Sequence, residues 1–386
     1  MNYKALAYRC GFPVQYLFAP KHPRMSLTEA AIRAELAHIS DPDTGLDLIT
    51  GNNVQAIGVD GNNAAIALQW RYPARSAHPA LIAAIESRLK SVLGATAVAV
   101  SIDTRIPAHK VQNALSPLPG VKNIIAVASG KGGVGKSTTA VNLALALVAE
   151  GAAVGILDAD IHGPSIPMML GITGKPDSLD GKTVEPKIAH GLQAMSIGLF
   201  LGEDTPTIWR GPMTTQYLQQ LLTTTRWQDL DYLIIDLPPG TGDIQLTLAQ
   251  RVPVSAAIIV TTPQDIALID AKKALKMFEK VEVPVLGIIE NMATHICSNC
   301  GHAEAIFGEG GGARMAEQYG VELLGQLPLA RQIREQMDSG QPTVAADPDS
   351  PAAVAYRGIA RKAAARLSQQ ARNKNIGIPN IVIQNT

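Results

Sequence analysis

A glycine-rich segment carries a lysine and a hydroxyl at the spacing of a phosphate-binding loop. The pattern of glycine, four residues, glycine, lysine and serine starts at Gly130 and ends with Lys136 and Ser137. In such a loop backbone N–H groups surround phosphate oxygens, the lysine reaches the β- and γ-phosphates, and the hydroxyl ligates Mg²⁺. An apolar run precedes the segment and a helical pattern follows it, which adds the positive end of a helix dipole. The predicted nucleotide-binding residues are Gly130, Lys131, Gly132, Gly133, Val134, Gly135, Lys136, Ser137 and Thr138.

Acidic residues end two later apolar runs. Asp158 and Asp160 close the run that starts at Ala153, and strand alternation would place both carboxylates on one face, where a nearby cation would relieve their repulsion. Two solvated acids at a strand end are the alternative interpretation. Asp236 ends the run 232–235 in the manner of a Walker B strand and is expected to hold Mg²⁺ directly or through water. The proline- and glycine-rich loop 238–243 then has the stiffness and hinges of a γ-phosphate sensor.

The chain has three cysteines, of which Cys297 and Cys300 form a Cys-x-x-Cys pair. The third, Cys10, lies in an irregular N-terminal segment, and three cysteines cannot supply a four-thiolate site within one chain. A symmetric dimer would bring two thiols from each copy to its axis, a ligand set for a [4Fe–4S] cluster or for tetrahedral zinc. A redox dithiol, a zinc site with His295 or His302, and a pair of inert thiols are the other interpretations.

The residues between these motifs predict the fold that positions them. From Lys122 onward, short apolar runs alternate with helix-length segments, which indicates an α/β fold with a doubly wound, mostly parallel sheet. Ligands of such sheets bind beyond the carboxyl ends of the strands, where the motifs lie. The expected strands are 124–128, 153–157, 192–197, 232–235, 256–260, 285–289 and 323–327.

A small α+β unit is expected before this sheet. It combines a helix from about residue 26 to 37, with Ser26 as N-cap, strands at 54–59, 64–70 and 97–102, and a helix at 78–93. The predicted division of the chain is an irregular extension 1–25, the α+β domain 26–106, a linker 107–122, a P-loop domain 123–371 and a tail 372–386.

The bulk composition excludes several classes of protein. Lysine plus arginine and aspartate plus glutamate number 33 each, so net charge gives no general attraction to nucleic acid or to an anionic membrane. No apolar run reaches the length of a membrane span. Three cysteines are too few for a disulfide scaffold and favour a reducing compartment, so we expect a cytoplasmic protein.

The motifs together resemble those of a known family. The loop Gly130–Ser137 is similar to the deviant Walker A loop of the ParA, MinD and nitrogenase iron-protein group. The segments 158–165, 238–243, 290–292 and 297–301 follow in the order seen in Mrp/ApbC/Nbp35 iron–sulfur cluster carrier ATPases, over roughly residues 120–370. The turn 41–47 resembles that of the MIP18-type domain which often precedes the ATPase in bacterial members.

This resemblance implies an ATPase that carries iron–sulfur clusters as a homodimer, with a [4Fe–4S] cluster bridged by Cys297 and Cys300 of both copies. It implies recipient apoproteins, and scaffold proteins, as partners. It also implies that Lys131 reaches the nucleotide of the partner copy, that Asp160 positions the attacking water, that Asp158 lies near Mg²⁺, and that Asn291 contacts adenine.

Two other functions were compared with this one. A positioning or partition ATPase of the MinD/ParA type would bind membrane or DNA through a basic amphipathic terminal helix or a basic patch, and the end of this chain has no convincing apolar face. A reductase like the nitrogenase iron protein would place its cluster cysteines far apart in sequence. The Cys297–Cys300 spacing favours the carrier.

Overall fold

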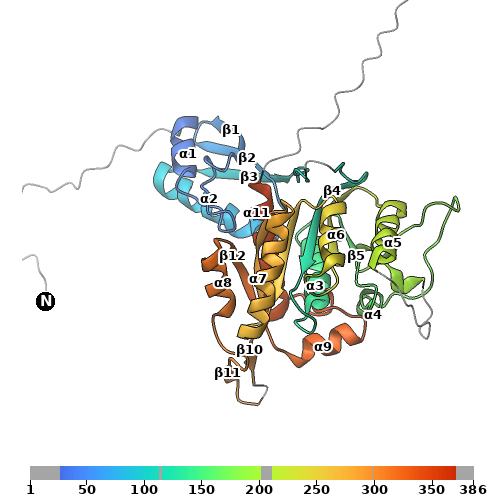
Figure 1. Cartoon of the computed structure of the whole chain (residues 1–386). Coiled ribbons are helices and arrows are strands. Elements are labelled where there is room, and N and C mark those ends of the chain that lie inside the picture. The colour runs from blue at the N-terminus through green and yellow to red at the C-terminus, as the bar shows by residue number, and fades with distance from the viewer. Residues whose placement is uncertain (1–26, 113–114, 201–210, 298, 371–386) are drawn as a thin grey trace, which may run out of the picture. The chain divides into compact units, whose positions relative to one another are not determined.

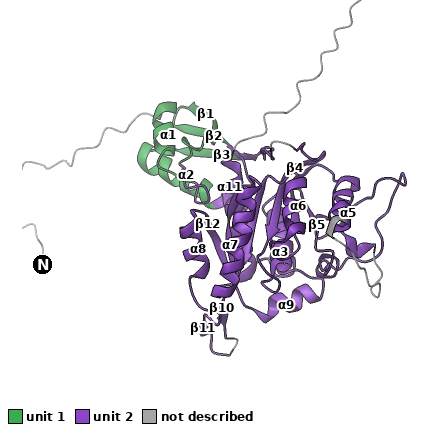
Figure 2. Ribbon diagram, viewed as in Figure 1, with its two compact units in different colours: residues 1–40, 47–68, 80–101 green, residues 41–46, 69–79, 102–386 purple. Residues whose placement is uncertain are grey.

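The computed structural model describes residues 27–112, 115–200, 211–297 and 299–370 (Figure 1). The chain forms two compact units (Figure 2). The smaller one comprises the chain up to residue 40 with 47–68 and 80–101, and the larger one comprises 41–46, 69–79 and 102–386. The predicted extension 1–25, Ser26, Cys10 and the tail 372–386 lie outside the described residues. The five predicted domain bounds therefore stay a prediction.

The smaller unit has helices packed on a three-stranded sheet. Its first helix is capped by Thr28, whose side chain accepts a hydrogen bond from the Ala31 amide. The strand order is β1-β2-β3, and β1 and β2 are antiparallel. The elements of this part of the chain are α1 (Glu29–Leu36), β1 (Val54–Asp60), β2 (Asn63–Trp70), α2 (His78–Leu93) and β3 (Ala97–Thr104).

The larger unit is built on one sheet, to which nine strands of the described residues contribute. The order is β11-β10-β9-β4-β8-β5-β7-β6, and β12 pairs with β10. The pairs between central strands are parallel, as predicted, while β6 and β11 are antiparallel additions that the sequence did not reveal. The strands are β4 (Val121–Ala128), β5 (Val154–Asp158), β6 (Lys187–Ala189), β7 (Leu192–Ser196), β8 (Leu230–Asp236), β9 (Ala256–Thr261), β10 (Val285–Ile296), β11 (Ala303–Glu304) and β12 (Glu322–Pro328).

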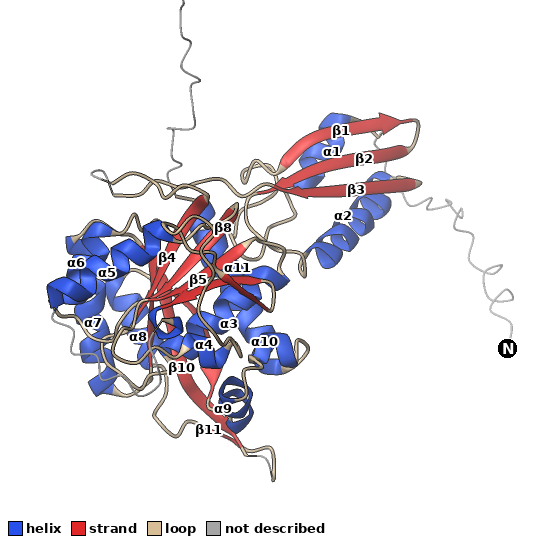
Figure 3. Cartoon of the chain, turned by 90° about the vertical axis from the view of Figure 1, so that its right-hand side faces the viewer, coloured by secondary structure: helices blue, strands red, loops and turns tan. Residues whose placement is uncertain are grey.

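Helices cover both faces of this sheet (Figure 3). Helices α3 and α11 pack together on one face, and α6 and α7 lie on the other. No helix in the described ranges has the length and apolar character needed to cross a bilayer. The helices are α3 (Lys136–Ala149), α4 (Ile166–Met169), α5 (Gly211–Thr224), α6 (Asp243–Arg251), α7 (Asp265–Lys280), α8 (Gly311–Tyr319), α9 (Arg331–Asp338), α10 (Thr343–Ala346) and α11 (Pro351–Ser368), with the 3₁₀ turn Ile197–Leu199 after β7.

The central strands are apolar along their whole length because both faces are covered. In β4 every residue except Lys122 is buried, and β9 is buried throughout. Helix α3 is rich in alanine and leucine and is buried from Thr139 to Leu147, so it lies directly on the sheet. Burial of this kind contributes roughly 25 cal/mol per Å² of apolar surface and fixes the strand ends that carry the motifs.

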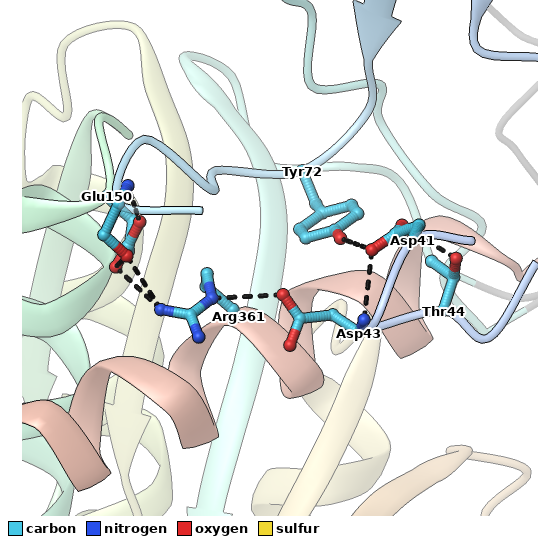
Figure 4. Close-up of polar contacts among 7 residues, drawn as sticks. Asp41, Asp43, Thr44, Tyr72, Glu150 and Arg361 are labelled. Atoms are coloured by element: carbon cyan, nitrogen blue, oxygen red, sulfur yellow. Dashed lines mark hydrogen bonds and ion pairs between the residues drawn. The ribbon is translucent and has the colours of Figure 1, made fainter. Parts of the chain in front are cut away.

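A cluster of buried charges lies at the C-terminal end of α3 (Figure 4). The Glu150 carboxylate accepts hydrogen bonds from the amide and hydroxyl of Ser76 and pairs with Arg361 of α11 at 3.2 Å. The same guanidinium pairs with Asp43 at 3.0 Å. Asp41 holds the turn that presents Asp43, because its carboxylate accepts hydrogen bonds from the Asp43 amide and from the Thr44 and Tyr72 hydroxyls. All these residues belong to the larger unit.

Candidate functional site

The phosphate-binding loop lies between β4 and α3. Strand β4 runs between β8 and β9, so the loop emerges at the centre of the sheet. Gly135 is in the left-handed region with φ 78°, and a Cβ on it would collide with the side-chain amide of Asn291. A Cβ on Gly130 would collide with the Asp270 backbone in α7. These two glycines are therefore required by backbone shape and by close approach.

Three strand ends gather the predicted groups. Val127 of β4 is the register partner of Asp236 in β8, and Asp236 is the partner of Asp158 in β5. The loop and the two acids thus lie side by side at the carboxyl edge of the sheet, as the motif positions predicted. This edge is where ligands of doubly wound sheets bind.

Lys136 lies in the site as a buried ion pair. Its Nζ is 2.5 Å from Asp236 Oδ1 and 3.3 Å from Ser137 Oγ, and both charged side chains are almost fully buried. Burial raises the pKa of Asp236, while the Lys136 ammonium opposes that rise. Asp236 Oδ2 is buried and has no hydrogen-bond partner among the described residues. A buried carboxylate oxygen without a partner beside a serine hydroxyl is an acceptor pair suited to a divalent cation.

Asp158 is buried and saturated with hydrogen bonds. Oδ1 accepts from the Asp160 amide, and Oδ2 accepts from the Ile166 amide and the Ser196 hydroxyl. Burial first, and then repulsion from Asp236, raise its pKa to about 7. These bonds hold the segment that follows β5, and the predicted place of Asp158 near Mg²⁺ stays a prediction.

Asp160 lies past the end of β5, which closes at Asp158. The expectation that alternation along one strand sets both carboxylates is therefore wrong, because there is no strand at Asp160 to alternate. Asp160 is nevertheless near enough to Asp236 for its charge to raise the pKa of that residue. It is only half-buried, and its predicted role in positioning water stays a prediction.

Lys131 is half-buried at the rim of the loop. Its carbonyl accepts a hydrogen bond from Ser129 Oγ, while its ammonium has no bond to any described residue. Asn291 is buried just past Glu290, the last residue of β10 paired with β9, and its side-chain amide donates to the Val134 carbonyl at 2.8 Å. Asn291 therefore braces the phosphate loop, a role that the sequence did not suggest. Its predicted contact with adenine stays a prediction.

The cysteine pair lies on the hairpin between β10 and β11. His295 pairs with Glu304 and Ile296 with Ala303 in this hairpin, and the Cys297 amide donates to the His302 carbonyl. Cys300 is exposed and Cys297 is half-buried.

The Cys297 thiol is activated by its own turn. Hydrogen bonds from the backbone amides of Cys300 and Asn299, and then from the Cys300 side chain, lower its pKa. The last of these bonds brings the two sulfur groups together. A neighbouring pair with one stabilised thiolate is suited to binding a soft metal centre.

Comparisons with known proteins place these features in a family. Residues 120–364 match the family described as NUBPL iron-transfer P-loop NTPase, and residues 29–102 match the iron-sulfur cluster assembly protein family. The chain belongs to the NUBPL iron-transfer P-loop NTPase family. As a P-loop NTPase of this kind it is an ATPase.

Individual relatives agree with this assignment. The chain is 51% identical over 342 residues to the iron-sulfur cluster carrier protein of Escherichia coli strain K12, which covers 88% of this chain and 93% of that protein. It is 58% identical to the protein of the same name from Pseudomonas fragi, over 72% of this chain and 97% of the relative.

A solved structure is similar over the ATPase part. This is a nucleotide-binding protein of Archaeoglobus fulgidus in complex with ADP, with 37% identity and a TM-score of 0.52, covering 61% of this chain and 91% of the other. These matches confirm the predicted fold class and family.

Proposed function

We propose that this ATPase binds iron–sulfur clusters and transfers them to apoproteins, and that ATP controls the homodimer that holds the cluster. The observation that carries the proposal is the Cys297–Cys300 hairpin, a partly exposed thiol pair joined by one strand to the nucleotide site. The names of the relatives, iron-sulfur cluster carrier proteins, agree with it.

The cluster is the cargo of this reaction. Each chain offers two thiols in the hairpin, and a [4Fe–4S] cluster takes four thiolates, so a second copy would supply the other two. Transfer exchanges these thiolates for those of the recipient, without change in the charge of the cluster. A partly exposed pair on a narrow hairpin suits such an exchange because a recipient thiol can approach it.

The nucleotide site fits Mg²⁺ and ATP. Asp236 Oδ2 and Ser137 Oγ are positioned to hold Mg²⁺, which would neutralise charge on the β- and γ-phosphates. Lys136 would exchange its bond to Asp236 for one to phosphate. The free ammonium of Lys131 is available to a nucleotide of the partner copy, and Asp160 to the attacking water, as the family resemblance implies.

Anaerobic reconstitution with iron and sulfide tests the cluster site. The wild-type protein is expected to gain about four iron atoms per dimer, as a [4Fe–4S] cluster requires. Cys297→Ala and Cys300→Ala should each lose the cluster and keep ATP binding. His302→Ala is the matched control in the same hairpin and should retain the cluster. A full cluster in either cysteine variant, or its loss in the histidine variant, would contradict thiolate bridging between two copies.

A further inference from the structure

The segment that carries both cysteines connects β10 to α8 and contains β11. It begins where β10 ends at Ile296 and returns at Gly311, the first residue of α8. The far end of this segment, at the start of α8, is bonded to the side chain of Glu290 in β10.

The Glu290 carboxylate is fully buried and bonds to two separate elements. One oxygen accepts a short hydrogen bond from the Gly312 amide, which lies in the first turn of α8 and 22 positions further along the chain. The other oxygen accepts from the Gln326 side chain of β12 at 2.6 Å. No ion pair to this carboxylate occurs among the described residues, so its charge is stabilised by these donors and by the start of a helix.

The start of α8 is shaped to accept this contact. A Cβ on Gly312 would lie 2.9 Å from Glu290 Oε2, and a Cβ on Gly311 would lie 2.5 Å from the Pro263 carbonyl oxygen. A side chain at Gly311 would collide with the backbone of Pro263, and one at Gly312 would crowd the side chain of Glu290. The glycines and the carboxylate thus form one close-packed joint.

The next residues of β10 bind the nucleotide loop. Asn291, adjacent to Glu290, donates to the Val134 carbonyl. Met292 follows with φ 57°, an uncommon left-handed conformation for a residue with a side chain, and the register with β12 shifts between Glu290 and Thr294. The strand is therefore released from regular pairing between the nucleotide loop and the cysteine hairpin.

We propose that Glu290 is a positioning residue that transmits the state of the nucleotide loop to the cysteine hairpin. A shift of Val134 on ATP binding displaces Asn291. Glu290, the next residue, carries this displacement to Gly312 at the start of α8, where the cysteine segment ends. The inference rests on the proposed function, since it assigns the route by which ATP controls the cluster site.

The test measures alkylation of Cys297 and Cys300 by iodoacetamide, resolved by mass spectrometry, with and without Mg²⁺ and a non-hydrolysable ATP analogue. Glu290→Gln keeps the side-chain volume but replaces one carboxylate oxygen by an NH₂ group. That group would then face the N–H donor of either Gly312 or Gln326. Glu309→Gln makes the same chemical change at an exposed position of the same loop and is the matched control. Nucleotide affinity of each variant is measured in parallel.

In the wild type and in Glu309→Gln, nucleotide is expected to change the alkylation rate by about 5-fold or more, the lower end of ordinary coupling between sites. In Glu290→Gln nucleotide should still bind, and this ratio should fall close to one. A merely structural role would change both rates equally and leave the ratio intact, and that result would overturn the inference.

Two further outcomes keep the test decisive. Gln326→Met removes one of the two bonds to Glu290 at an exposed position, so it should fold and show an intermediate ratio even if Glu290→Gln does not fold. If Gln326→Met keeps the wild-type ratio of alkylation rates, and Glu290→Gln folds and keeps it too, the route through Glu290 is refuted. The proposed function is not affected by that result. If the wild type itself shows no nucleotide effect, ATP control in the proposed function fails as well.

Discussion

Helix α3 has a buried ion pair at each end. The two pairs differ in whether every buried polar atom has a hydrogen-bond partner. At its first turn, Lys136 pairs with Asp236, and one carboxylate oxygen of Asp236 is left without a partner among the described residues. At its C-cap, Glu150 bonds to Ser76 and Arg361, and the guanidinium also reaches Asp43. None of the buried side-chain atoms of this second cluster is left without a partner.

This difference separates a site that binds a ligand from one that holds the fold. A buried carboxylate at a helix C-terminus opposes the helix dipole, so Glu150 is stable there only because Arg361 and Ser76 compensate it. Lys136 and Asp236 compensate each other only in part and keep an unused acceptor. The end of α3 that has a buried oxygen without a hydrogen-bond partner, at Lys136 and Asp236, is the one expected to exchange partners when a ligand binds.

The largest effect is expected from Lys136→Ala. Removing this ammonium should lower the rate of ATP hydrolysis by about 100-fold or more, because a charged donor to the transferring phosphoryl group is lost from a buried site. The measurement is phosphate release under saturating ATP. Lys280→Ala, at an exposed helix end, is the control and should hydrolyse normally. Normal hydrolysis by Lys136→Ala would remove this end of α3 from the catalytic site.

A smaller effect, on stability alone, is expected from Arg361→Ala. It leaves Glu150 and Asp43 buried without their cation, which should lower the free energy of unfolding by about 3 kcal/mol. ATP affinity should stay at the wild-type value. Urea unfolding measures the first quantity and nucleotide titration the second.

Arg334→Ala on α9 breaks exposed ion pairs and should cost at most about 1 kcal/mol. Equal losses in the two arginine variants would show that the cluster around Glu150 contributes no more than a surface pair.

The smallest effect concerns pH. Burial raises the pKa of Asp43 above 3.8 even though Arg361 opposes the rise. The folded state therefore binds more protons than the unfolded state just above that pH, and this residue's contribution to stability falls as the pH increases through that window. The difference in unfolding free energy between wild type and Asp43→Asn should decrease with pH.

Asp180 provides a control of opposite sign. Its pKa is lowered to about 2, mainly by the Thr183 amide, so its contribution should rise as the pH increases from about 2 to 3.8. Parallel trends for Asp43→Asn and Asp180→Asn in urea unfolding would contradict the assignment of Asp43 as a desolvated acid.

The sequence predicted the features that are local in the chain. Each of the seven apolar runs is a strand, the helix His78–Leu93 has its predicted limits, and the loop before Lys136 opens a helix as its spacing required. Local patterns suffice here because hydrophobic periodicity and glycine placement act over a few residues.

Features that depend on distant contacts were not predicted. One local feature was also missed: the first helix starts at Glu29, so its N-cap is Thr28 and the prediction of Ser26 is wrong. Arg361 and Asp43 are 318 positions apart, and no local pattern connects them. The brace from Asn291 to the phosphate loop also depends on tertiary packing, because β9 lies between β10 and β4.

The joint between Glu290 and Gly312 has a consequence for how tightly cargo is held. The hydrogen bond between Glu290 and Gly312 joins residues that are 22 positions apart. Closing a segment of that length removes on the order of 3 kcal/mol of chain entropy before any metal binds. The hairpin pairs shorten the free part further, to the turn around the thiols. Because the cysteine hairpin is already ordered, less conformational entropy would be lost when a cluster binds to it. In the proposed function, retention and release of the cluster would then depend on ligand exchange at sulfur.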